Sequence, residues 1–124
     1  MELAPLRQIL INAGEAAFLR GDLLLASHAL GSGLSLPWQG DSDRRTRLLE
    51  TFCAAWLETR PTSARLDVVL LMVEALGRRI SSVARRRHDV LDLVRECLVL
   101  NPGAETIIVA AAQHNGIQEG ELLR

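Results

Sequence analysis

The stretch from Ala13 to Leu30, AGEAAFLRGDLLLASHAL, contains the turn on which our prediction of the fold depends. Apolar or small residues recur every three or four positions on both sides of Gly21-Asp22, which is the spacing of one face of an α-helix. Glycine readily ends a helix, and aspartate caps the free N–H groups of the helix that follows it. The sequence therefore predicts one helix over residues 5–20 and a second over residues 23–34, joined by a tight turn.

This stretch resembles a tetratricopeptide repeat, a family of helix pairs that stack side by side. Gly14 stands where the family has a small residue in the first helix, Gly21-Asp22 forms the turn, and Ala26 stands where the second helix touches the first. The resemblance implies a closely packed antiparallel pair. A degenerate unit over residues 43–79 and a partial one ending at Cys97–Pro102 extend the resemblance over residues 5–104. Leucine and alanine replace the family's aromatic residues, at Leu10, Ala17, Leu23 and Leu30.

Helical periodicity continues along the rest of the chain, broken by turn-forming residues. Pro61 ends one helix, and Thr62 or Ser63 is expected to cap the next. We therefore predict an all-α fold of about six helices packed as antiparallel pairs, in a tetratricopeptide-like right-handed superhelix or a compact helical bundle. All 124 residues are expected to form a single domain with a frayed tail over 117–124. The further helices are expected over residues 43–58, 64–79 and 105–115, with another ending near 100 and capped by Ser81, Ser82 or Asp89.

The charged residues restrict the chemistry that the chain can carry out. All 14 basic residues are arginine, and the sequence contains neither lysine nor tyrosine. Mechanisms that need a Schiff-base lysine, a P-loop lysine or a phenolic acid are thereby excluded. The formal net charge is −1, so no general attraction to nucleic acid is expected.

The expected compartment is the cytoplasm. No basic segment followed by an apolar run marks a signal peptide at the N-terminus, and no apolar stretch approaches the ~20 residues that span a bilayer. Cys53 and Cys97 both lie in apolar helical patterns, as expected for buried free thiols in a reducing compartment. A disulfide or a metal pair is the alternative for these two residues.

Two clusters of polar residues are compatible with other functions. His88, Asp92 and Glu96 share one face of a predicted helix and could ligate a divalent metal. A solvated polar face is the favoured interpretation, because no second cluster in the sequence supplies complementary ligands. The arginines between Arg78 and Arg87 could bind phosphate, but acidic residues follow them directly. A metal-binding helical protein and a nucleic-acid-associated regulatory domain are therefore the alternative functions.

The resemblance implies a binding module whose groove holds a helical or extended segment of another protein, or a second copy in a homo-oligomer. Small tetratricopeptide-like proteins of bacterial type III secretion are chaperones of this kind, and the size and composition of this chain fit them. We expect a non-enzymatic adaptor or chaperone without a cofactor. Trp38 either anchors the partner or folds back over the core. The residues expected at the partner surface, with membership of the core as the alternative, are Leu10, Ala13, Ala17, Phe52, Trp56, Leu57 and Trp38.

Overall fold

The computed structural model describes residues 3–38, 40–60 and 65–122, and these ranges contain helices and no strand. The all-α prediction is therefore confirmed. Contacts divide the chain into two compact units, residues 1–61 and 62–124, which we call unit 1 and unit 2 and describe separately. The single domain expected over residues 1–124 stays a prediction, because two such units can belong to one domain.

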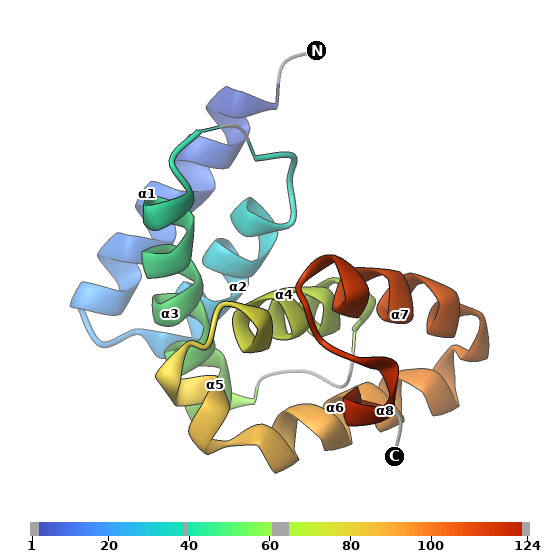
Figure 1. The fold of residues 1–124 in the computed structure, drawn as a ribbon. Coiled ribbons are helices and arrows are strands. Elements are labelled where there is room, and N and C mark those ends of the chain that lie inside the picture. Colours follow the sequence, from blue (N-terminus) through green and yellow to red (C-terminus); the bar gives the residue numbers. More distant parts are fainter. Residues whose placement is uncertain (1–2, 39, 61–64, 123–124) are drawn as a thin grey trace. The chain divides into compact units, whose positions relative to one another are not determined.

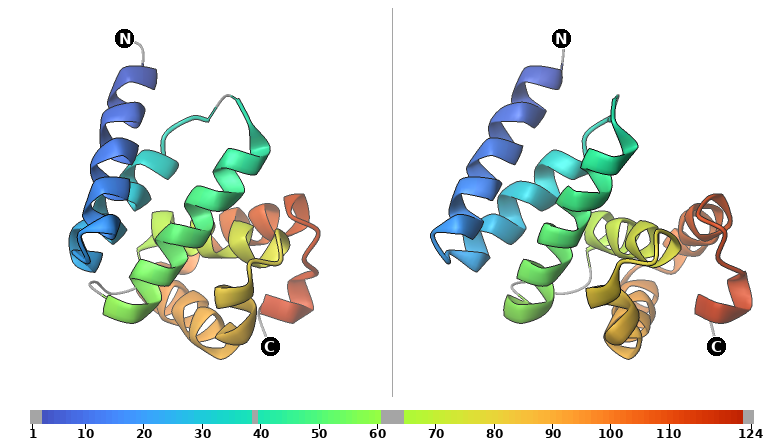
Figure 2. Two further views of the ribbon diagram at one scale, coloured as in Figure 1. Left: turned by 90° about the vertical axis from the view of Figure 1, so that its left-hand side faces the viewer. Right: turned by 60° about the vertical axis from the view of Figure 1, so that its left-hand side comes forward.

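Unit 1 consists of three helices, α1 (Ala4–Leu19), α2 (Leu23–Leu34) and α3 (Ser42–Thr59). The helix α2 packs against both α1 and α3, while α1 and α3 share few contacts. The three helices run alternately in opposite directions, with α2 between the other two (Figures 1 and 2). The predicted boundaries of the first two helices are thus correct to within one residue.

Small residues bring α1 and α2 close together. A Cβ atom at Gly14 would lie 2.6 Å from Cγ and 3.0 Å from the backbone N of Leu30, so only glycine fits there without a shift. Ala17 and Ala26 form a small buried cluster with Ala55 of α3. The small-residue positions of the predicted repeat therefore make the contacts expected of them. Any tightly crossed helix pair favours such residues, so the repeat family itself stays a prediction.

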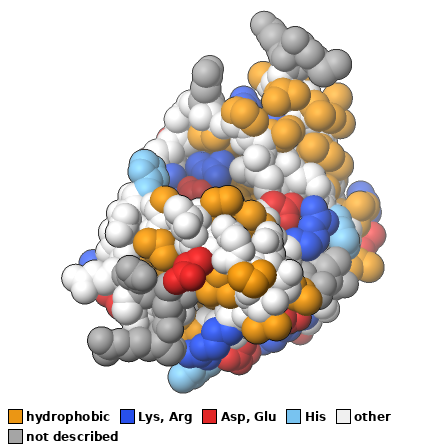
Figure 3. Space-filling model, turned by 90° about the vertical axis from the view of Figure 1, so that its right-hand side faces the viewer, with side chains coloured by type: hydrophobic (Ala, Val, Ile, Leu, Met, Phe, Trp, Pro, Cys, Tyr) orange, Lys and Arg blue, Asp and Glu red, His pale blue; other side chains and the backbone are white. Residues whose placement is uncertain are grey.

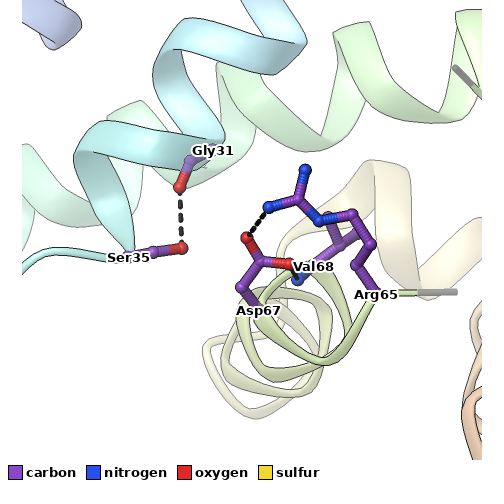
Figure 4. Close-up of polar contacts among 5 residues, drawn as sticks. All are labelled: Gly31, Ser35, Arg65, Asp67 and Val68. Atoms are coloured by element: carbon purple, nitrogen blue, oxygen red, sulfur yellow. Dashed lines mark hydrogen bonds and ion pairs between the residues drawn. The ribbon is translucent and has the colours of Figure 1, made fainter. Parts of the chain in front are cut away.

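Local hydrogen bonds fix the ends of α2. Gly21 adopts a left-handed φ of +81°, and the Asp22 carboxylate accepts a hydrogen bond from the Leu25 backbone N at 3.2 Å, as a capping residue does. At the other end, the Ser35 hydroxyl donates to the Gly31 carbonyl oxygen at 2.7 Å (Figure 4). The predicted turn and its aspartate cap are both confirmed.

The connection to α3 differs slightly from the prediction. The helix begins at Ser42, one residue before the expected start, and Asp41 caps it with a carboxylate that accepts from the Asp43 backbone N at 2.8 Å. The helix ends at Arg60, whose φ of 40° is left-handed. The caps predicted at Thr62 and Ser63 lie outside the described residues.

Unit 2 is built around α4, which packs against α5, α6 and α7. Close to its first residue, the Arg65 guanidinium pairs with the Asp67 carboxylate at 2.7 Å, and Asp67 also accepts from the Val68 backbone N (Figure 4). Near its end, a Cβ atom at Gly77 would lie 2.6 Å from Asn115, which brings α4 and α7 into close contact. The elements of unit 2 are α4 (Leu66–Gly77), α5 (Ser81–Arg85), α6 (Arg87–Leu100), the 3-10 helix η1 (Pro102–Ala104), α7 (Glu105–His114) and α8 (Glu119–Leu122).

Unit 2 departs from the prediction at two places. The helix expected to end near 100 is broken at Arg86, where ψ of 37° takes the backbone out of the helix, and no side chain caps either piece. No glycine or proline marks this break, and apolar residues on both sides of it are buried. The tail expected to fray instead forms α8, in which Leu122 is only 1% exposed. Burial of this leucine holds the tail in place.

No helix in the described ranges is both long enough and apolar enough to cross a bilayer.

Candidate protein-binding surface

Most residues predicted to line a groove belong to the core. Ala17, Phe52, Trp56 and Leu57 are all buried, Leu10 is half-buried, and Ala13 is exposed. The Phe52 ring lies directly beside Gly31, where an added Cβ atom would come within 2.9 Å of it. The structure thus does not bring the predicted set together on one surface, because close packing of α2 on its neighbours draws the larger members inward.

The exposed apolar side chains of α1 form a different surface. Leu6 is 47% exposed and Ile9 is 65% exposed, and both Ala13 and Ala16 are exposed as well. Steps of three, four and three residues place these four side chains along one face of the helix. We call this set, Leu6, Ile9, Ala13 and Ala16, the α1 stripe. Hydrophobic side chains gather in a patch at the upper right of the face drawn in Figure 3.

The inward face of α1 is formed by other residues. Ile11, Gly14 and Ala17 are buried against the rest of the protein. The spacing of Leu6, Ile9 and Ala13 is helical, but it does not indicate whether these residues face the core or the solvent. Both faces of this helix carry apolar residues. What distinguishes the outward series is that its side chains are left in contact with water.

The α1 stripe contains no charged residue. Arg7 and Glu15 are the only charged residues within Ala4–Leu19. Arg7 donates a hydrogen bond to the Pro37 carbonyl oxygen, which turns it towards the following loop, and Glu15 does not belong to the stripe. Exposed apolar faces of this kind commonly mark surfaces that bind other proteins.

A second group of exposed apolar residues lies at the turn between α1 and α2. Leu19 ends α1, and Leu24 and Leu25 occupy the first turn of α2; all three are exposed. Sequence reasoning placed these leucines in helices but did not identify them as surface residues. These leucines adjoin a tight, capped turn in the sequence, and this position indicates that they lie at the end of the helix pair.

Trp38 lies over unit 1 rather than extending from it. Three guanidinium groups approach its ring, with the Cζ atoms of Arg7, Arg44 and Arg45 at 5.1, 6.0 and 5.6 Å from the ring centre. Within the described residues its buried indole N–H has no hydrogen-bond partner. Cation–π contacts at such distances hold the ring in place, which favours the alternative in which Trp38 folds back.

The arginines of the Arg78–Arg87 segment are close to acidic side chains. Arg78 pairs with Glu74 at 2.9 Å, Arg86 with Asp89 at 2.8 Å, and Arg87 with Glu121 at 3.3 Å. The carboxylates compete with any phosphate for these guanidinium groups. Arg87 and Glu121 also border a hollow of about 590 Å³ in unit 2, whose lining includes Leu76, Arg79 and Asn115.

The polar face of α6 does not assemble into a metal site. Asp92 pairs with Arg95 at 3.1 Å. Among the described residues, no group of three or more histidine, cysteine or acidic side chains is arranged to hold a metal ion. Cys97, on the same helix, is a buried free thiol, and burial raises the pKa of its side chain.

Comparisons with known proteins add no relative from which a function can be transferred. No family model, no curated protein and no solved structure matches the chain.

Proposed function

We propose that this chain is a non-enzymatic protein-interaction module that binds a partner helix along the α1 stripe. The observation that carries the proposal is the uncharged series Leu6, Ile9, Ala13 and Ala16 on the outward face of α1. A partner helix can cover such a series along its whole length, as helices that bind in apolar grooves or pair with each other do. An adaptor or chaperone role fits a surface of this kind.

The rest of unit 1 supports the proposal because α1 is packed closely against α2. Gly14 of α1 lies against Leu30, and Gly33 of α2 lies against Ile11, which is completely buried. A partner would therefore dock on a preformed helix, so little conformational entropy is lost when it binds. Covering the exposed parts of Leu6 and Ile9 would contribute about 1 kcal/mol for each side chain.

The two free cysteines are consistent with this role in a reducing compartment. Cys53 and Cys97 are both buried and unbridged. A protein of this type needs no disulfide to stabilise its core. We propose that this binding function operates in the cytoplasm.

The experiment that tests the proposal is site-specific photocrosslinking in the native cell. A benzophenone amino acid at position 9 is expected to form an adduct with another protein chain, because this position lies in the middle of the α1 stripe. The same amino acid at position 50, an exposed residue of α3, is the matched control and should give no such adduct.

A second substitution tests whether the adduct formed from position 9 depends on the α1 stripe. Leu6→Asp introduces a charge into the α1 stripe without touching the core, so it should abolish the adduct formed from position 9. Equal adducts from positions 9 and 50, or an adduct that persists in the Leu6→Asp chain, would contradict the proposal.

A further inference from the structure

The hollow in unit 2 is lined by apolar side chains and by charged ones. Leu76, Ala84 and Ile117 supply apolar surface, and Leu76 and Ile117 are themselves buried. Arg79 and Glu121 also line the hollow, and both are exposed, so the hollow opens to solvent where the charges lie. Its volume of about 590 Å³ is in the range of pockets that bind small organic molecules, about 300–1,000 Å³. Such a lining suits a molecule with an apolar body and a charged group.

The two arginines at the hollow differ in their partners. The Arg87 guanidinium pairs with the Glu121 carboxylate at 3.3 Å. Within the described residues, the Arg79 side chain has no hydrogen bond, ion pair or ring contact. Arg79 is therefore the guanidinium at which the hollow carries uncompensated positive charge, and an anion is the group that it attracts.

The backbone of Arg79 is strained. Its φ of 59° is left-handed. Its backbone N–H donates to the Leu76 carbonyl oxygen and the Ile80 N–H donates to the Ala75 carbonyl oxygen, both at 3.1 Å. This pair of hydrogen bonds ends a helix in the way that usually places glycine at the left-handed position, because any other residue costs free energy there.

The other left-handed arginine of the described residues has a partner inside the protein. Arg60 has a φ of 40°, and its Cζ atom lies 5.5 Å from the centre of the Trp56 ring. Arg79 has the same kind of strain without such a contact, and it lines a hollow. Strained backbone conformations concentrate at sites that hold ligands.

From the uncompensated Arg79 beside apolar surface, we infer that the hollow in unit 2 binds a small organic carboxylate with an apolar body. The Arg79 guanidinium donates two hydrogen bonds to the carboxylate, and the apolar body lies against Leu76, Ala84 and Ile117. A carboxylate matches one guanidinium in charge and in planar shape, whereas a phosphate dianion would keep an unbalanced charge. The inference concerns unit 2 and does not depend on the function proposed for the α1 stripe.

Glu121 has a separate effect on the same site. Its carboxylate neutralises Arg87, so the second guanidinium at the hollow is occupied by a side chain of the protein itself. Glu121→Gln removes this negative charge and frees Arg87 for the ligand. We therefore expect Glu121→Gln to lower the dissociation constant of a carboxylate about threefold, the modest effect typical of exposed charges.

The test is a titration of the full chain with octanoate, followed by two-dimensional NMR of the backbone amides. The amides of Gly77 and Gly116, which line the hollow, should shift on binding, with a dissociation constant on the order of millimolar. Octanol has the same apolar body without the charge and is the matched control ligand. We expect octanol to bind about tenfold more weakly than octanoate.

Replacing Arg79 separates binding from stability. Arg79→Gly removes the guanidinium and relieves the left-handed strain, so it should raise the dissociation constant of octanoate about tenfold. Its urea midpoint should equal or exceed that of the wild type. Arg79→Gln should weaken octanoate binding to the same extent, because both variants lose the charge. Arg60→Gly, the matched change at the other left-handed arginine, should leave octanoate binding unchanged.

Four results would overturn the inference. Equal affinities for octanoate and octanol would show that the charge is not recognised, and unchanged octanoate binding by Arg79→Gly would show that Arg79 is not the residue that recognises it. Shifts confined to the amides of α1 would place the octanoate on the α1 stripe instead of the hollow. Tighter binding of octyl phosphate than of octanoate would overturn the choice of a carboxylate.

Discussion

Units 1 and 2 both expose large apolar side chains, but they distribute them differently. In unit 1 the exposed residues Leu6 and Ile9 belong to a regular series along one helix. In unit 2 the exposed residues Val99, Leu100 and Ile107 cluster around the end of α6 and the beginning of α7. Spacing, more than the amount of exposed apolar surface, therefore distinguishes a surface that another helix can follow.

The two units also differ in the partners of their arginine side chains. In unit 2, arginines pair with acidic side chains on the same or a neighbouring helix, as in Arg78–Glu74 and Arg87–Glu121. In unit 1, Arg7 and Arg44 lie over the Trp38 ring. Both units nevertheless depend on a glycine at a close helix contact, and this shared feature allows them to be perturbed one at a time.

The largest effect is expected from Gly14→Leu in unit 1. The new side chain would overlap Leu30, which is fully buried and has no space to move, so unit 1 should lose about 3 kcal/mol of stability. Both tryptophans, Trp38 and Trp56, lie in unit 1, so urea unfolding followed by tryptophan fluorescence reports on this unit. Ala54→Leu, at an exposed position of α3, is the control and should change the midpoint little. Equal midpoints for Gly14→Leu and Ala54→Leu would show that the α1–α2 contact is less tight than described.

A smaller effect is expected from Gly77→Ala in unit 2. The added methyl group would lie 2.6 Å from Cβ and the carbonyl oxygen of Asn115, and the resulting strain exceeds the gain in helix propensity. We expect a net loss of about 1 kcal/mol. Far-ultraviolet circular dichroism, which follows both units, should shift to lower urea concentration, whereas tryptophan fluorescence should not. A shift of both signals by the same amount would show that the two units unfold together.

The smallest effect concerns the pH dependence of stability in unit 2. Burial raises the pKa of Cys97, so the folded chain keeps this thiol protonated at a pH where the unfolded chain has begun to lose the proton. Stability from this group is therefore fully present below the unfolded pKa, near 8.5, and is lost as the pH rises through the folded value. The absence of lysine and tyrosine leaves few other groups that titrate in this range. Unfolding free energies measured from pH 7.5 to 10 should fall more steeply for the wild type than for Cys97→Ala, and equal slopes would contradict the assignment.

Much of unit 1 could be predicted from local sequence signals. Gly21 and Asp22 determine the turn through backbone freedom and side-chain capping, and such signals act within a few residues. The close approach at Gly14 is what the resemblance to the repeat implies, because a small residue stands at that position of the repeat. By contrast, the break at Arg86 and the ordered tail at Leu122 depend on contacts with residues distant in the sequence, which periodicity does not report.

The candidate surface shows a different limit of sequence reasoning. The sequence leaves Phe52, Trp56 and Leu57 either in a groove or in the core, and the structure buries all three. The helical spacing that predicts a helix over residues 5–20 does not indicate which of its faces points outward. When a helix is apolar on both faces, only its packing partners decide which face is left for another molecule.

The division of the chain at residue 61 has a consequence for its synthesis. The contacts that define unit 1 are made within residues 1–61, mainly between helices that follow one another directly. Helical folds with such local contacts form in microseconds to milliseconds, whereas a ribosome needs about 3 to 13 seconds to add residues 62–124. The first unit can therefore present α1 while the second is still being translated.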